Sequence, residues 1–295
     1  FLSYSPFLFF FIIPFINLFF NEDSLSKEIN IDAHQILSPI EKNNKEKIMA
    51  DIIDIINNSK SDYVIFGENN FPNLIDRNNT SNLAAINTND KKVIIGGTSF
   101  KNDTYYNSFI LLQDHKISFF DKKILVPFGE FLPFRKYFKF MEKISGSVDF
   151  EKGKLDRIIN TNDNLKILPI ICYEIIFDKI FNNIDNNKID IMINITNDSW
   201  FGNKIGPYQH FYIARVKSLI ANRPLIRVSN NGISAIINQD GKIVISTKLN
   251  QITNFKYKLI LSEQISFIRF HNYYIFYFIF ITLFLIISTK KKLNV

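Results

Sequence analysis

The sequence predicts an α/β sandwich flanked by a membrane-spanning segment at each end. Short apolar strands alternate with amphipathic helices through the middle of the 295-residue chain, and the last strands form a hairpin. Chemically versatile residues directly follow several of these strands, which is where α/β folds place their chemistry. Residues 1–20 and 273–288 carry no charge, and each run is near the ~20 residues of a bilayer span, the second when extended to 267–289.

The two apolar ends define the expected domain organisation. Residues 1–20 carry no charge and match the ~20 residues of a membrane-spanning helix. No methionine or basic leader precedes them, so we expect the end of a truncated membrane domain rather than a signal peptide. Residues 267–289 are the second expected membrane helix. The lysines 290–292 that follow it indicate a cytoplasmic end, which would put the intervening domain on the periplasmic side of an inner membrane.

Composition narrows the function classes. The net charge of +7 is scattered along the chain without a basic stripe that interleaves aromatic residues, so we expect no nucleic-acid partner. The chain has one cysteine, Cys172, and therefore no internal disulfide. His34, His115 and His271 show no metal-ligand spacing with it, so no metal site is predicted.

The first half of the domain reads as a helix followed by strands. We expect residues 21–44 to be a connector with a possible strand at 29–31, and residues 45–262 to form the catalytic domain. Isoleucines at helical spacing predict a helix over 45–58. A strand at 63–66 then delivers Glu68 at its end. The further predicted elements are a strand at 92–96, a loop at 98–104, and a hairpin of strands 105–112 and 117–120.

The second half is organised around the apolar run 165–174, which contains Cys172. Segment 131–150 mixes aromatic and basic residues and fits either a solvated loop or a surface that touches lipid. The remaining predicted elements are a strand at 189–196, a helix at 209–221, and strands at 224–229, 234–237 and 242–246, the last two joined at Asp240-Gly241.

Glu68, Lys122 and Cys172 each stand at or just past the end of a predicted strand. A thiol attacks an acyl carbon as the thiolate, so it needs a base or a positive environment. Glu68 can take the proton, and Lys122 can stabilise the thiolate and an oxyanion. Taken singly, each residue also fits a structural role: a loop carboxylate, a solvated charge and a small core residue. Composition and spacing leave both interpretations open.

Five motifs carry further information, at residues 105–108, 121–130, 171–174, 197–202 and 223–232. They resemble motifs of the nitrilase, or carbon-nitrogen hydrolase, superfamily, and within it of the apolipoprotein N-acyltransferase family. The resemblance extends over about residues 63–241, in the family's order. It implies an αββα nitrilase-like sandwich with a Glu-Lys-Cys triad.

The resemblance implies roles for individual residues. Glu68 would be the general base, Lys122 the oxyanion stabiliser and Cys172 the nucleophile that carries a thioester. Glu130 would orient Lys122. Tyr173 and Glu174 would line the same pocket. We expect Asn197, Asp198 and Trp200 to form a wall of it. Asn197 also fits a backbone turn cap, and a dyad of His210 with Cys172 is a minor alternative.

The implied reaction moves an acyl chain from a phospholipid to the N-terminal amine of the diacylglyceryl-cysteine of an apolipoprotein. The expected partners are therefore a phospholipid donor, an apolipoprotein acceptor and the bilayer, with no cofactor. Two alternatives stay open. One is a nitrilase-type amidase that hydrolyses small amides, and the other is a non-catalytic nitrilase-like binding module.

Overall fold

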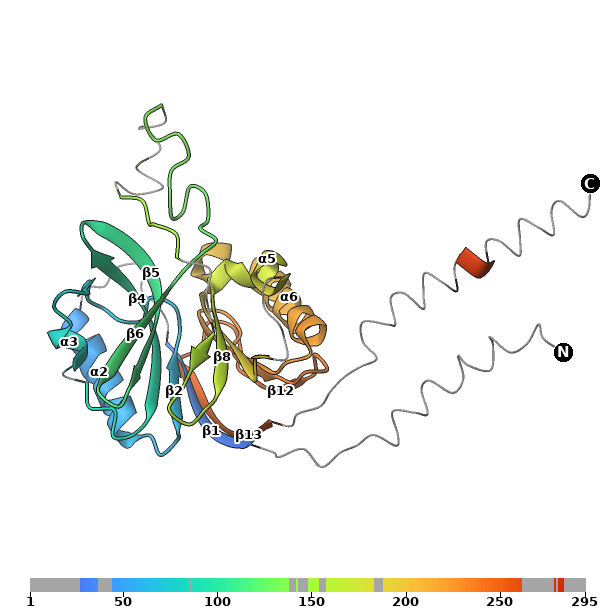
Figure 1. Cartoon of the computed structure of the whole chain (residues 1–295), viewed down its shortest axis with the longest axis horizontal. Helices are drawn as coiled ribbons and strands as arrows, with labels where there is room; N and C mark the ends of the chain where they lie inside the picture. The colour runs from blue at the N-terminus through green and yellow to red at the C-terminus, as the bar shows by residue number, and fades with distance from the viewer. Residues whose placement is uncertain are drawn as a thin grey trace, which may run out of the picture. The chain divides into compact units, whose positions relative to one another are not determined.

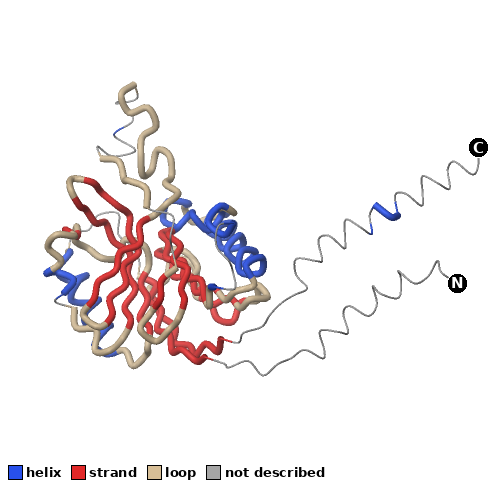
Figure 2. The backbone as a smooth tube through the Cα atoms, viewed as in Figure 1, coloured by secondary structure: helices blue, strands red, loops and turns tan. Residues whose placement is uncertain are grey.

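Two β-sheets stand between two layers of helices in the computed structural model (Figures 1 and 2). Contacts of β5 with β8 and of β2 with β10 bring the sheets face to face. The α/β sandwich predicted from the sequence is confirmed. The structure describes residues 27–36, 44–84, 86–137, 142, 148–153, 158–182, 188–261, 279 and 281–283.

The first sheet has the strand order β13-β1-β2-β4-β5-β6, and β3 pairs with β4. Strands β1, β2 and β4 run parallel, whereas β4, β5 and β6 are antiparallel neighbours. The strands are β1 (Lys27–Gln35), β2 (Tyr63–Phe66), β3 (Ile75–Asp76), β4 (Lys92–Lys101), β5 (Thr104–Gln113), β6 (Lys116–Asp121) and β13 (Thr253–Leu261).

The second sheet repeats this pattern with the order β12-β11-β10-β9-β8-β7. Strands β8, β9 and β10 are parallel, and β10, β11 and β12 are antiparallel. The parallel strands β2 and β8 end just before Glu68 and Cys172. The strands are β7 (Ile159–Asn160), β8 (Lys166–Ile171), β9 (Ile191–Asn197), β10 (Leu225–Asn230), β11 (Ala235–Ile237) and β12 (Ile243–Ser246).

Each sheet packs its outer face against helices. The first sheet shares a buried apolar cluster with α2 (Lys45–Asn58) and α3 (Ser81–Ala84), in which Ile52 and Ile56 of α2 are buried. The second sheet packs on α6 (Ile205–Ala221) and α5 (Lys179–Asn182). The helix over 45–58 was predicted at these bounds because its isoleucines recur at helical spacing.

Several elements differ from the sequence predictions. The prediction of a loop at 98–104 is wrong, because β4 continues to Lys101. The chain then turns back through Asn102 and Asp103, both at positive φ. The range 21–44, expected as a connector with a strand near 29–31, contributes β1 (Lys27–Gln35) to the sheet. Strand β13 (Thr253–Leu261) was not predicted, and α6 begins at Ile205, four residues earlier than expected.

Membrane spans were predicted at 1–20 and 267–289. The first lies outside the described residues, as does the second apart from residues 279 and 281–283. No helix in the described part of the chain combines the length and the apolar character needed to cross a bilayer.

Candidate active site

The ends of three strands bring the predicted triad into one cavity of about 400 Å³. Glu68 follows β2, Lys122 follows β6 and Cys172 follows β8. All three side chains line the cavity, and each is at most 6% exposed. The structure therefore brings together three residues that are up to 104 positions apart in the sequence.

Cys172 lies at the sharp turn that follows β8 and is the first residue of the 3-10 helix η2 (Cys172–Ile176). Its φ of +50° is in the left-handed region, which costs free energy for a residue with a Cβ and is typical of functional positions. Behind the turn, the Glu174 carboxylate accepts hydrogen bonds from Ile171 N at 2.8 Å and Lys123 N at 2.6 Å. Glu174 is fully buried and ties the two loops together, so it lies behind the cavity rather than in the wall predicted for it.

Lys122 is held between two carboxylates. Its Nζ lies 2.8 Å from Glu130 Oε1 and 3.8 Å from Glu68 Oε1. The other oxygen of Glu130 accepts a hydrogen bond from Val126 N at 2.8 Å, which fixes the carboxylate. Glu130 thus has the contacts of a residue that orients Lys122.

Asn107 on β5 completes this polar group, and sequence reasoning did not assign it. Its Nδ2 donates to Glu68 Oε1 and to Glu130 Oε1, both at 2.8 Å. Its position within segment 105–108, which resembles the nitrilase superfamily, is the sequence signal that could have identified it. One amide therefore spaces two carboxylates that share a single lysine.

The loop that presents Glu68 is fixed by asparagines. Asn70 Oδ1 accepts from Gly67 N at 2.7 Å, and Asn230 of β10 donates to the Glu68 carbonyl. A Cβ on Gly67 would lie 2.3 Å from Asn230 Oδ1, so the close approach of the two sheets requires glycine there.

Burial dominates the electrostatics of the triad. Burial raises the pKa of Glu68, and Lys122 only partly offsets it. Burial also raises the pKa of Cys172 to about 12, with a further contribution from Glu68. Burial opposes the charge on Lys122, but Glu68, Cys172 and Glu130 outweigh it and raise the pKa of Lys122 above its usual range. The free site therefore holds a protonated thiol and a charged lysine.

Apolar and aromatic groups form the cavity wall. Tyr173, Phe201 and Trp200 line it, and the Trp200 side chain is 76% exposed. Asn197 lines the cavity too, and its Oδ1 accepts from Ser199 N at 3.2 Å, so it is also a turn cap. A larger hollow of about 530 Å³ beside Arg77 shares no lining residue with this cavity, and neither cysteine nor serine is among the residues that line it.

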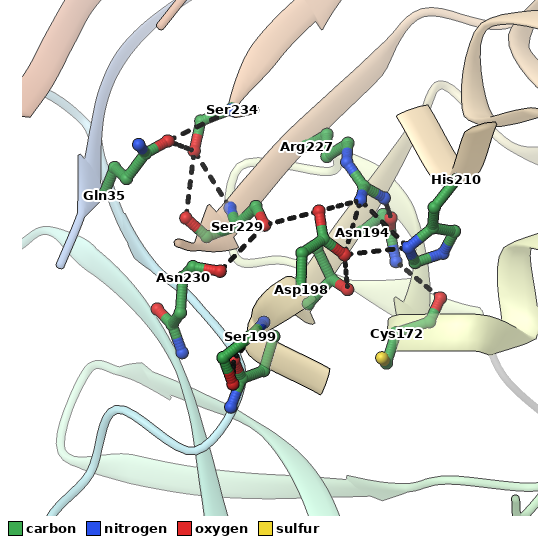
Figure 3. Close-up of polar contacts among 12 residues, drawn as sticks. Gln35, Cys172, Asn194, Asp198, Ser199, His210, Arg227, Ser229, Asn230 and Ser234 are labelled. Carbon is green, nitrogen blue, oxygen red and sulfur yellow. Dashed lines mark hydrogen bonds and ion pairs between the residues drawn. The ribbon is translucent and has the colours of Figure 1, made fainter. Parts of the chain in front are cut away.

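His210 does not face the thiol. Its Nδ1 lies 2.8 Å from Asp198 Oδ1, and the residue is 3% exposed (Figure 3). Burial and the nearby Arg227 lower the pKa of His210, which keeps the imidazole neutral. The Cys-His dyad considered above has no support in this geometry.

Curated relatives match the central part of the chain. The apolipoprotein N-acyltransferase of Rickettsia typhi is 40% identical over 178 residues, covering 58% of this chain and 36% of that protein. The protein of the same name from Rhizobium leguminosarum bv. trifolii is 34% identical over 206 residues, covering 65% and 38%. The matched part thus spans little more than a third of the length of these relatives.

Solved structures share the fold at low identity. A CN-hydrolase superfamily protein of Xanthomonas campestris has a TM-score of 0.60 at 13% identity, covering 80% of this chain and 91% of that one. A carbon-nitrogen hydrolase of Helicobacter pylori has a TM-score of 0.59 at 14% identity, covering 79% and 89%. The carbon-nitrogen hydrolase family model matches residues 45–259, well over half of the sequence. The chain therefore belongs to the carbon-nitrogen hydrolase family.

Proposed function

We propose that this chain contains the catalytic domain of an apolipoprotein N-acyltransferase. Cys172 takes an acyl chain from a phospholipid and passes it to the N-terminal amine of a diacylglyceryl-cysteine on an apolipoprotein. The observation that carries the proposal is the convergence of a buried base, cation and thiol in one cavity with apolar walls. The named relatives supply the substrate class.

The first half-reaction forms a thioester. As Cys172 Sγ attacks the ester carbonyl carbon, its proton passes to Glu68, because the thiol pKa is too high for a resting thiolate. Lys122 Nζ stabilises the negative oxygen, together with the N–H of Tyr173, which as a first-turn residue of η2 has no intrahelical acceptor. Glu68 then protonates the departing glycerol oxygen, and a lysophospholipid leaves.

In the second half-reaction an amine is the attacking group and the Cys172 sulfur is the leaving group. The free amine of the acceptor cysteine attacks the thioester carbon, and Glu68 accepts a proton from the nitrogen. The C–S bond breaks, the N–C bond remains, and the proton on Glu68 returns to Cys172. Splitting the transfer lets two lipid substrates use one cavity in turn.

The cavity surroundings support a lipid substrate. Trp200 at the cavity is 76% exposed, and Phe134 and Tyr137 in the loop after Glu130 are 75% and 76% exposed. Arg135 of the same loop is ion-paired with Asp149 and Glu142. Exposed aromatic side chains are typical of surfaces that contact membrane interfaces. We place this surface at the periplasmic side of the inner membrane, as the lysines 290–292 indicate.

A labelling experiment tests the proposal. The full chain in detergent micelles is incubated with a phospholipid that carries a radiolabelled acyl chain. We expect a hydroxylamine-sensitive protein adduct that Cys172→Ala abolishes, because the chain has no other thiol. An undiminished adduct in Cys172→Ala would contradict the proposal, as would release of free fatty acid at the full rate without any adduct.

A further inference from the structure

A buried polar cluster lies directly behind the nucleophile turn (Figure 3). It consists of Asn194 on β9, Asp198 at the start of the 3-10 helix η4 (Asp198–Phe201), His210 on α6 and Arg227 on β10. Each of the four is at most 3% exposed. None of their side chains belongs to the triad, so their chemistry is not used by the proposed reaction.

The Asn194 amide connects this cluster to Cys172. Its Oδ1 accepts from Arg227 Nη1 at 2.6 Å, and a guanidinium can only donate, so the orientation of the amide is fixed. Its Nδ2 must then point the other way, toward the carbonyl oxygens of Ile170 at 3.2 Å and Cys172 at 3.4 Å. The side chain thus holds the backbone on both sides of the turn.

Arg227 is itself held rigidly. Its Nη2 lies 2.8 Å from Asp198 Oδ2, and neither side chain is exposed. Asp198 Oδ2 also accepts from Ser229 Oγ at 2.9 Å, and its Oδ1 lies 2.8 Å from His210 Nδ1. Arg227 lowers the pKa of Asp198 despite burial, so the ion pair remains charged. The ion pair and its hydrogen bonds leave this buried cluster few alternative arrangements.

We infer that Asn194 is a positioning residue for the nucleophile, anchored through Arg227. By holding the Cys172 carbonyl it keeps the backbone at its φ of +50°, the conformation in which the thiol faces Glu68. The inference rests on the proposed role of Cys172 as the nucleophile. Small displacements of a reacting group cost large factors in rate.

Asn194→Asp is the sharpest variant. The new carboxylate still accepts from Arg227 but cannot donate to the Cys172 carbonyl. Gln35→Glu is the matched control. Gln35 is 1% exposed, and its Nε2 donates to the carbonyls of Lys248 at 2.8 Å and Gln251 at 2.9 Å, without contact to Cys172. Asn194→Ala removes the donor without adding charge and serves if the aspartate variant does not fold.

The readout is alkylation of the single thiol by iodoacetamide in the full folded chain, with and without Glu68→Gln. In the parent protein and in Gln35→Glu we expect Glu68→Gln to slow alkylation by at least about tenfold. With Asn194→Asp or Asn194→Ala, Glu68→Gln should change the rate by less than about twofold, because the thiol no longer faces the base. An equal effect of Glu68→Gln in all backgrounds overturns the inference.

Acyl transfer provides a second, separable readout. With the labelled phospholipid, Asn194→Asp should lower the rate at saturating donor by roughly 10–100-fold and leave KM within about threefold. If the parent protein forms no acyl adduct at all, the proposed function fails, while the alkylation cycle still decides the role of Asn194. If Glu68→Gln slows alkylation equally in the parent and Asn194→Asp backgrounds, and Asn194→Asp leaves the acylation rate unchanged, only the positioning role is refuted.

Discussion

The two sheets supply the site in different ways. The first provides its ionised groups, with Lys122 Nζ at 2.8 Å from Glu130 and 3.8 Å from Glu68. The second provides an uncharged thiol and keeps its own charges, Asp198 and Arg227, one layer behind it. In the proposed account, charge on the first side serves chemistry, whereas charge on the second fixes the backbone that presents Cys172.

The largest expected effect comes from removing the cation of the first sheet. Lys122→Met leaves the buried Glu68 and the part-buried Glu130 without their partner, so acylation should fall by about 10³-fold or more. The free energy of unfolding should fall by roughly 3–5 kcal/mol, as for a broken buried ion pair. Single-turnover labelling and urea denaturation measure the two effects. Lys116→Met, on an exposed lysine of β6, the strand that Lys122 follows, is the control, and an equal loss there would remove the special role of Lys122.

A smaller effect is expected from Glu130→Gln. Glu130 accepts hydrogen bonds from Lys122, Asn107 and Val126, and a glutamine has one acceptor oxygen to replace two. We expect the acylation rate to fall by roughly 10–100-fold with KM nearly unchanged, since a charge-assisted contact to the oxyanion stabiliser is weakened. Glu142→Gln, which breaks a part-exposed pair with Arg135, should stay close to the parent rate. Equal losses in both variants would argue against an orienting role.

The pH dependence of the alkylation rate distinguishes a thiol that gives its proton to Glu68 from a thiol that ionises by itself. Glu68 has a raised pKa, so the rate should increase as pH rises above 4.5 and then level off once Glu68 is ionised. No second increase is expected near the ordinary thiol pKa, because that of Cys172 is raised to about 12. In Glu68→Gln the rate should keep rising by about tenfold per pH unit beyond pH 9. A parent profile with a midpoint at 8–9 would contradict the assignment of Glu68 as base.

The smallest expected effect concerns His210 of the buried polar cluster behind the Cys172 turn. Its pKa is lowered by burial and by Arg227, although Asp198 opposes this, so the unfolded state binds the proton more readily. The contribution of His210 to the free energy of unfolding is therefore present above about pH 6.5 and is lost as pH falls, by at most about 1.4 kcal/mol per pH unit. Urea denaturation from pH 7.5 to 5 should show this slope. His210→Gln should remove it and leave the separate contribution of Glu68, which is common to both proteins.

The sequence predicted the elements that carry the triad because their signals are local. Strand β2 is a short β-branched run, α2 repeats isoleucine at helical spacing, and Cys172 ends an apolar run. The strand β13 was not predicted, although its buried positions alternate with exposed ones, which is the local pattern of a half-buried strand. Its pairing with β1, more than 200 residues away, has no local signal in the sequence.

The supporting residues of the site could not be predicted for the same reason. Asn107 gains its role only where β5 passes Glu68 and Glu130, and Asn194 only where β9 lies beside the nucleophile turn. Glu174 was placed in the cavity wall because it is adjacent to Tyr173 in sequence. In the 3-10 helix η2 its carboxylate turns back onto backbone N–H groups, while Tyr173 faces the cavity.

A chase experiment tests the central claim most directly. The acyl adduct of the full chain is formed with labelled phospholipid, freed of excess donor, and mixed with a peptide that begins with diacylglyceryl-cysteine. We predict that the label leaves Cys172 and appears in amide linkage on the peptide amine, with no transfer to the same peptide after N-acetylation. Label that stays on the protein, or is released only as free fatty acid, would contradict the acyl-transfer account.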